Sequence, residues 1–382
     1  MIQVSFQENV KIIYGTGSIQ LTGELLKGCG YNKVLVVHDA GVAGILEHLL
    51  NSLNEYGISY IQFDKVQPDP PSHIVDECSE LCNREGCDAV IAFGGGSVID
   101  TAKGVNILRF NEGPILRYSK PDAEIIPSPG LISIPTTAGT GSETSDGLII
   151  TDVEKKVKVP ILATNAMSEY AILDAGLMCG MPPKLTAYTG LDALAHSCEA
   201  YTSTRSNSFT GLILEKMIET VTTWLPIAVQ DGSNLEAREH MAITSCLGGC
   251  MLTNNGTHAG HSFAHILGAK YHIPHGAACA YAEPYILEYN AAVIPEKVMK
   301  IGKIMGGEFY DKATPTEIGA VVRKLYIGFY KSLGLPPITE FITEVPDWNM
   351  LAAAIMDEPF LAFNPRKMEH NDIIETLQHI IL

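Results

Sequence analysis

The chain has 382 residues, of which 46% are hydrophobic and 18% are charged, so it can bury large cores and is not a disordered protein. Its 26 lysines and arginines against 43 aspartates and glutamates leave a net charge of −17, which repels phosphate backbones and anionic lipid. We therefore expect two or three domains and a small-molecule ligand, with no nucleic-acid or membrane partner.

The first 178 residues alternate apolar strands with amphipathic helices. Four apolar runs predict strands, at residues 33–38, 58–63, 88–93 and 131–134. Three helical patterns lie between them, at residues 44–56, 72–85 and 98–109. Continuous apolar strands separated by helices indicate a mostly parallel sheet that is covered on both faces. This pattern therefore predicts an α/β domain over residues 1–178.

After residue 178 the strand-like alternation nearly disappears. Pro182 and Pro183 mark a boundary, because the residue before a proline avoids the helical region. Seven long helical patterns follow, at residues 184–202, 206–229, 234–253, 258–269, 276–290, 294–305 and 314–333. We expect an all-helical domain over residues 179–382 and place the active site in the cleft between the two domains.

The N-terminal residues and the cysteines favour the cytoplasm. Residues 1–15 carry polar and acidic side chains where a signal peptide needs an apolar core. The cysteines are odd in number and form no CxxC pair, which is typical of reduced core cysteines in a cytosolic protein. They are scattered along the chain: Cys29, Cys78, Cys82, Cys87, Cys179, Cys198, Cys246, Cys250 and Cys279. Cys246 and Cys250 share a helical face and are interpreted as small core residues.

A glycine-rich turn, GGGS at residues 94–97, follows the third predicted strand. Three glycines let the backbone approach a phosphate, and the next helix supplies free N–H groups and the positive end of its dipole. Ser97, with Asp100 three residues later, resembles a capping box. The spacing is not GxGxxG, so a turn with only a packing role stays open as the alternative.

Other residues near the predicted strand ends also fit a nucleotide. Asp39 follows the first strand, where a carboxylate accepts hydrogen bonds from an adenosine ribose and repels a 2′-phosphate, which favours NAD over NADP. Residues 134–143, IPTTAGTGSE, offer hydroxyl and backbone donors to a pyrophosphate or a nicotinamide ring. Lys158 has the length to reach a ribose or a phosphate. The alternatives are an exposed loop aspartate, a loop without a ligand and a surface lysine.

Histidines and a carboxylate recur at helical spacing in the second half. Asp192 and His196 stand four residues apart, as do His261 and His265, and side chains at this spacing share one face of a helix. His275 follows. A lone histidine is more often a hydrogen-bonded core residue, but a buried carboxylate without a cation is costly. The pattern therefore predicts a divalent metal, and imidazoles with a carboxylate suit Fe(II), Zn(II), Co(II) or Ni(II).

Taken together, these segments resemble the iron-containing (group III) alcohol dehydrogenase family. The matching pieces keep their order along most of the chain: YGTGS at 14–18, PDP at 68–70, GGGS at 94–97, IPTTAGTGSE at 134–143, MPPKLT at 181–186, GLDALAH at 190–196, GH at 260–261, PHG at 274–276 and NPR at 364–366. The resemblance implies a Rossmann-like N-terminal domain with a parallel sheet and an all-α C-terminal domain.

The resemblance also assigns roles to individual residues. It implies metal ligands at Asp192, His196, His261 and His275. Fe(II) is the expected metal, with Zn(II) as the alternative. It implies NAD contacts at Asp39, Gly95, Gly96, Ser97, Thr136, Thr137, Thr140, Ser145 and Lys158. The family usually has asparagine where Asp69 stands, so an extra carboxylate lies near the expected cofactor.

The activity implied is a reversible, NAD(H)-linked hydride transfer between a small primary alcohol or diol and its aldehyde. His265 is the candidate catalytic proton relay, and a hydrogen-bonding role beside the metal ligands is the alternative. His196 favours this family over two relatives, the glycerol dehydrogenases and the dehydroquinate synthases. Few basic side chains occur in residues 180–300, which argues against the anionic substrate of a synthase-type lyase. Intact ligand positions argue against a non-catalytic assembly module, and we expect a homodimer.

Overall fold

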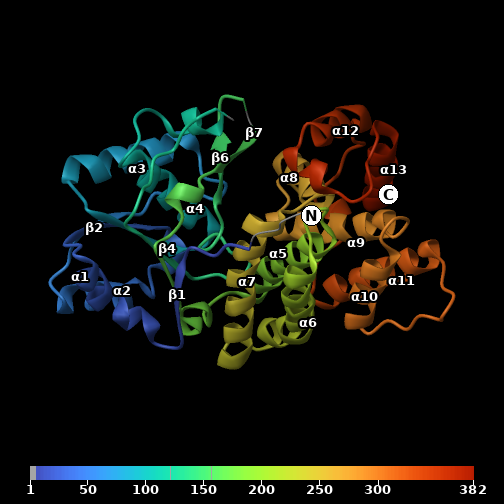
Figure 1. Ribbon diagram of the computed structural model, residues 1–382, viewed down its shortest axis with the longest axis horizontal. Coiled ribbons are helices and arrows are strands. Elements are labelled where there is room, and N and C mark those ends of the chain that lie inside the picture. Colours follow the sequence, from blue (N-terminus) through green and yellow to red (C-terminus); the bar gives the residue numbers. More distant parts are fainter. Residues whose placement is uncertain (1–5, 121, 156) are drawn as a thin grey trace. The chain divides into compact units, whose positions relative to one another are not determined.

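The computed structural model describes residues 6–120, 122–155 and 157–382 and divides the chain into two compact units (Figure 1). The first, here the α/β unit, consists of Gln7–Met181 and Ser233–Thr253. The second, the helical unit, contains Pro182–Gly232 and Asn254–Leu382. This division differs from the expected domains, residues 1–178 and 179–382, mainly because Ser233–Thr253 groups with the α/β unit.

The α/β unit contains a six-stranded sheet with the order β1-β8-β5-β4-β2-β3, in which every neighbouring pair is parallel. The strands are β1 (Lys11–Tyr14), β2 (Lys33–His38), β3 (Ser59–Phe63), β4 (Ala89–Gly94), β5 (Leu131–Pro135) and β8 (Tyr170–Leu173). The parallel sheet and the four predicted strands are confirmed, whereas β1 and β8 were not predicted. A separate antiparallel pair, β6 (Gly147–Asp152) and β7 (Val157–Leu162), was also not predicted.

Helices cover both faces of the sheet. Those of this unit are α1 (Thr22–Cys29), α2 (Leu46–Glu55), α3 (Ser72–Glu85), α4 (Gly96–Leu108) and most of α7 (Leu235–Asn255). Successive side chains of a strand point to opposite faces. Val36 of β2 accordingly lies in one core with Leu49 of α2, and Val37 lies in the other core with Val75 of α3. The sheet is therefore buried on both sides, as its continuous apolar strands predict.

The helical unit is built from α5 (Pro183–Thr202), α6 (Ser208–Gln230), α8 (Ala259–Tyr271), α9 (His275–Asn290), α10 (Pro295–Ile304), α11 (Pro315–Ser332), α12 (Trp348–Met356) and α13 (His370–Ile381). The seven predicted helices of the second half, with α7 among them, are confirmed, and α12 and α13 were not predicted. Helix α5 packs against α6 and α9, and α8 packs against α9. Within the described ranges, no helix combines the length and hydropathy needed to cross a membrane.

Candidate active site

The connections that leave the carboxyl ends of the neighbouring strands β2 and β4 run in opposite directions across the sheet. From β2 the chain runs through α2 to β3 on one side, and from β4 it runs through α4 to β5 on the other. In open parallel sheets, ligands bind at the carboxyl ends of the strands where such connections diverge. Asp39 follows β2 and Gly95 follows β4. The topology therefore places two predicted cofactor residues at this point.

The glycine turn packs against the hydroxyl-rich loop that follows β5. A Cβ atom at Gly95 would lie 3.1 Å from Oγ1 of Thr137, and one at Gly96 would overlap the side chain of Thr140. Glycine is thus required here because the two loops approach each other closely. The structure brings together six of the predicted cofactor residues: Gly95, Gly96, Ser97, Thr136, Thr137 and Thr140.

The expected capping box of Ser97 and Asp100 is wrong. Helix α4 begins at Gly96, with Gly95 as its N-cap and no side-chain cap. Asp100 instead accepts hydrogen bonds from Oγ of Ser142 and, at 3.0 Å, from the backbone N–H of Ile149. Because no side chain caps the first turn of α4, its N–H groups suit an anion such as a phosphate.

A buried lysine holds the end of the hydroxyl-rich loop. Nζ of Lys103 donates hydrogen bonds to the carbonyl oxygens of Ser145 and Gly147, both at 2.7 Å, and to Oγ of Ser145 at 3.1 Å. Burial lowers the pKa of Lys103, and the Asp100 carboxylate opposes this shift. The hydrogen bonds from Lys103 fix the Ser145 hydroxyl. In the same loop, burial raises the pKa of Glu143 to about 7.

Helix α7 supports this loop from the other side. Oγ of Ser245 accepts a hydrogen bond from the Gly141 backbone N–H at 3.2 Å, and Thr144 Oγ1 donates to the Cys246 carbonyl at 2.5 Å. A Cβ atom at Gly249 would overlap the carbonyl oxygen of Gly141. These contacts explain why Ser233–Thr253 groups with the α/β unit.

The two predicted charged cofactor residues have protein partners. Oδ1 of Asp39 accepts a hydrogen bond from the Gly41 N–H at 2.6 Å and caps a short 3-10 helix. Nζ of Lys158 lies 2.7 Å from Oδ1 of Asp69, a residue with a left-handed φ of 52°. Lys158 is thus paired with the carboxylate that departs from the family pattern.

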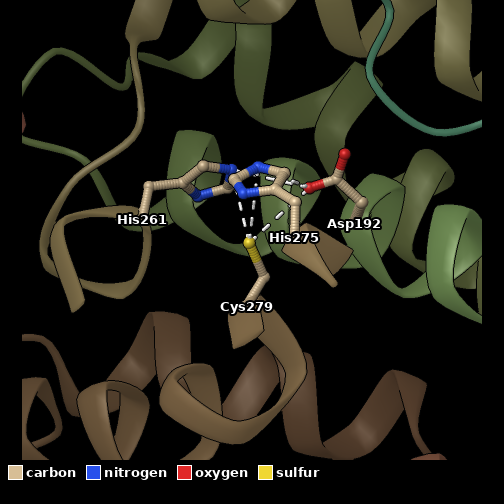
Figure 2. A group of neighbouring side chains, drawn as sticks. All are labelled: Asp192, His261, His275 and Cys279. Atoms are coloured by element: carbon tan, nitrogen blue, oxygen red, sulfur yellow. Dashed lines mark hydrogen bonds and ion pairs between the residues drawn. The ribbon is translucent and has the colours of Figure 1, made fainter. Parts of the chain in front are cut away.

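In the helical unit, Asp192 lies among three histidines (Figure 2 shows two of them). Its Oδ1 atom is 3.7 Å from Nε2 of His196, 3.6 Å from Nε2 of His261 and 3.5 Å from Nε2 of His275. Asp192 and His196 come from α5, His261 from α8 and His275 from the first turn of α9. The structure brings together all four residues that the resemblance names as metal ligands.

The thiol of Cys279 joins this cluster, and the sequence analysis did not single it out. Its Sγ atom lies 3.6 Å from Oδ1 of Asp192, 3.7 Å from Nε2 of His261 and 3.8 Å from Nε2 of His275 (Figure 2). The available signal was spacing, because Cys279 stands four residues after His275 and so shares its face of α9.

The donor atoms fit a divalent cation. Ligand atoms about 2.1 Å from a tetrahedral ion lie about 3.4 Å from one another, close to the 3.5 to 3.7 Å that separate Asp192 from the histidines. In the described part of the chain, the ion-pair partners found for Asp192 are histidines. Burial alone would raise the pKa of Asp192, but His196, His275 and His261 lower it well below its ordinary value.

Two buried carboxyl groups, also missed by the sequence analysis, lie next to the cluster. Oε1 of Glu199 is 2.5 Å from Nδ1 of His261, and Oε2 of Glu199 accepts a hydrogen bond from the His258 N–H at 2.6 Å. Both oxygens of Glu283 are buried without a hydrogen-bond partner among the described residues. Burial and the charge of Glu199 raise the pKa of Glu283 well above its ordinary value. A Cβ atom at Gly260 would overlap both carboxyl groups.

The predicted catalytic residue, His265, lies beside the same cluster. Its Nδ1 atom is 2.9 Å from Oε2 of Glu358. Its ring stacks on His275 with centroids 5.5 Å apart and meets the ring of Phe360 edge-on at 5.7 Å. His265 therefore contacts a proposed ligand while a carboxylate fixes its orientation.

Comparison with known proteins covers nearly the whole chain. The family model "Iron-containing alcohol dehydrogenase" matches residues 9–175, and "Fe-containing alcohol dehydrogenase family, C-terminal" matches residues 186–381. The chain is 34% identical to the choline dehydrogenase of Bacillus subtilis (strain 168), over 95% of this chain and 92% of that protein. It is 31% identical to the NAD-dependent methanol dehydrogenase of Bacillus methanolicus, over 97% of each. The crystal structure of a 1,3-propanediol oxidoreductase matches with a TM-score of 0.94 and 31% identity, over 99% of this chain and 100% of that one.

Proposed function

Because the chain belongs to the iron-containing alcohol dehydrogenase family, it is an NAD-dependent alcohol dehydrogenase, and we propose that Asp192, His196, His261 and His275 hold its divalent metal. The observation that carries this proposal is the convergence of three histidine Nε2 atoms on Oδ1 of Asp192, at 3.5 to 3.7 Å. The reaction is the reversible transfer of hydride between an alcohol and NAD.

We propose Fe(II) as the metal, with Zn(II) as the alternative, because both suit imidazole and carboxylate ligands. When bound, the ion supplies Lewis acidity at the oxygen of the alcohol or aldehyde. Asp192 offsets part of the charge of the ion, and Glu199 orients the ring of His261 through Nδ1. The burial of Asp192 and His261 limits the access of water to these atoms.

The carboxyl edge of the parallel sheet is the proposed site of NAD. The first turn of α4 presents its N–H groups to the pyrophosphate, and Gly95 and Gly96 keep the approach open. Asp39 accepts hydrogen bonds from the adenosine ribose. Lys158 contributes together with Asp69, whose carboxylate 2.7 Å away reduces the positive charge that Lys158 presents to the cofactor.

His265 is the proposed proton relay. Because its Nδ1 atom is held by Glu358, Nε2 is the atom that exchanges a proton. The alternative is that His265 only positions His275, on which it stacks. The His265→Asn variant separates the two roles: a relay predicts a changed pH dependence of kcat with normal metal content, and a positioning role predicts reduced metal content.

The substrate proposed is a small primary alcohol or diol. The relatives are named for choline, methanol and 1,3-propanediol, which share a primary alcohol group. We further propose a homodimer, the commonest assembly of such chains, in the cytoplasm, where the nine free cysteines would stay reduced. Light scattering coupled to size-exclusion chromatography tests the dimer.

The test of the proposed function is an assay of NADH absorbance with a panel of primary alcohols and their aldehydes, after reconstitution with Fe(II) or Zn(II). We expect turnover with at least one pair and its loss in Asp192→Asn, which keeps the shape of the side chain but removes its charge. Full activity of Asp192→Asn would contradict the proposed ligand set.

A further inference from the structure

We propose that Cys279 is a ligand of the divalent metal, so that the site takes a soft thiolate in addition to nitrogen and oxygen donors. This proposal rests on the proposed function, because it assumes a metal at Asp192, His261 and His275. It goes beyond the ligand set that the resemblance implies, which contains no sulfur.

The geometry supports Cys279 as strongly as it supports the histidines. One donor atom from each of Asp192, His261, His275 and Cys279 can be chosen so that all four lie within 4.8 Å of one another. The distances from Sγ of Cys279 to the other three atoms, 3.6 to 3.8 Å, match those among the imidazole and carboxylate atoms. A sulfur donor allows slightly longer separations, because a Zn–S bond is about 2.3 Å and a Zn–N bond about 2.0–2.1 Å.

Cys279 and His196 take different positions relative to Asp192. Nε2 of His196 lies 3.7 Å from Oδ1 of Asp192, but His196 is not in the group of four mutually close donors. The ring of His196 stacks on the ring of His261, with centroids 4.6 Å apart and an interplanar angle of 18°. The cluster therefore offers five donors, from which a metal can take four with sulfur or four without it.

The thiol of Cys279 contacts three polar atoms, which the packing of an ordinary core cysteine does not require. Cys279 is fully buried, and its Sγ atom faces the carboxylate of Asp192 and two imidazoles (Figure 2). Cys198 on α5 is equally buried in the same unit and lies outside the group of mutually close donors. The comparison distinguishes a thiol at a donor cluster from an ordinary buried cysteine.

Coordination by Cys279 changes the chemistry of the site in a defined way. The Sγ–H bond breaks, the sulfur lone pair forms the bond to the metal, and the proton passes to the buffer. No oxidant or reductant takes part. A thiolate donor strengthens the binding of Zn(II) relative to a site made by histidines and a carboxylate alone. The Cys279→Ser variant should therefore lose affinity for Zn(II) relative to its affinity for Fe(II).

Cobalt spectroscopy tests the proposal on the full chain. The protein is freed of metal, loaded with Co(II) and recorded in the near ultraviolet, where a bound thiolate produces a charge-transfer band that histidine and carboxylate do not. We expect one Co(II) per chain with this band in the wild type and in Cys198→Ala. We expect Cys279→Ala to lose the band and still bind Co(II) through Asp192 and the histidines.

The possible results separate the two proposals. Bound Co(II) without the band, or a band that persists in Cys279→Ala, would overturn the role of Cys279 and leave the metal site standing. Failure of the wild type to bind Co(II) would overturn the metal site itself. Should Cys279→Ala not fold, zinc X-ray absorption of the wild type decides, since a sulfur neighbour at about 2.3 Å supports the proposal and its absence contradicts it.

Discussion

Oε1 of Glu199 lies 2.5 Å from Nδ1 of His261, and the other ring nitrogen of His261 faces Oδ1 of Asp192 at 3.6 Å. A carboxylate on one nitrogen of an imidazole fixes the tautomer and orients the other nitrogen for a metal. Glu199 is itself held by the backbone N–H groups of His258 and His261. The orientation of His261 is therefore set by a fully buried carboxylate.

Glu199→Gln should lower metal affinity about 10- to 100-fold, because the amide no longer accepts a charge-assisted hydrogen bond from His261. Competition with a chelator, followed by metal analysis, measures the change. Glu283→Gln is the matched control, since Glu283 is buried beside the same cluster but its carboxyl oxygens accept no hydrogen bond among the described residues. Equal affinities in the two variants would contradict the role of Glu199.

Asp39→Asn should weaken the preference for NADH over NADPH by about tenfold or more, because the amide does not repel a 2′-phosphate. Asparagine keeps an oxygen that can accept the hydrogen bond from the Gly41 N–H, so the cap of the short helix is preserved. The ratio of kcat/KM for the two cofactors measures the effect. An unchanged ratio would rule out discrimination by Asp39.

Glu143 should make the protein less stable as the pH rises. Burial raises its pKa from 4.5 to about 7, so between these values the unfolded chain releases a proton that the folded chain retains. The contribution of Glu143 to the free energy of unfolding is then fully present below pH 4.5 and is lost as the pH rises through 7, by roughly 3 kcal/mol at most. Urea denaturation at pH 5 and pH 8 should show Glu143→Gln to be more stable than the wild type only at the higher pH.

Gly260→Ala should destabilise the helical unit by roughly 2 kcal/mol or more and reduce metal content, because a Cβ atom there overlaps the carboxyl groups of Glu199 and Glu283. Gly328→Ala on the exposed side of α11 is the control. A Cβ atom at Gly328 meets nothing within 4 Å, so alanine should add about 0.4–1 kcal/mol of stability. Thermal denaturation compares both variants with the wild type, and a stable, metal-replete Gly260→Ala would contradict the packing argument.

The strands with the clearest sequence signal are continuous apolar runs buried on both faces, although the more exposed edge strand Ser59–Phe63 was also predicted and the largely buried Tyr170–Leu173 was not. Lys33–His38 and Leu131–Pro135 are continuous apolar runs, and their alternate side chains enter both cores. Lys11–Tyr14 is mostly exposed and only four residues long, so its pattern does not differ from that of a loop. Parallel pairing with Tyr170–Leu173, far along the chain, forms this strand, and no local pattern encodes that pairing.

The metal cluster could be predicted from the sequence because part of its signal is local. The i, i+4 spacing of Asp192 and His196 needs only a helix to become a shared face. Glu199 and Glu283 stand in apolar helices, where burial gives no sign of which polar atoms they meet. The spacing of Cys279 from His275 places both on one face of α9 but does not show what that face contacts. Their positions depend on how α5, α8 and α9 pack, which only the tertiary structure reveals.

The dependence of the Gly141–Ser145 loop on α7 limits how this protein can be divided or recombined. A fragment that stops at residue 178 would carry the sheet and the glycine turn without Ser245, Cys246 and Gly249, on which that loop rests. Chimeras joined at residue 178 would pair the Gly141–Ser145 loop of one parent with helix α7 of the other. An exchange that keeps both intact must carry residues 233–253 along with residues 7–181.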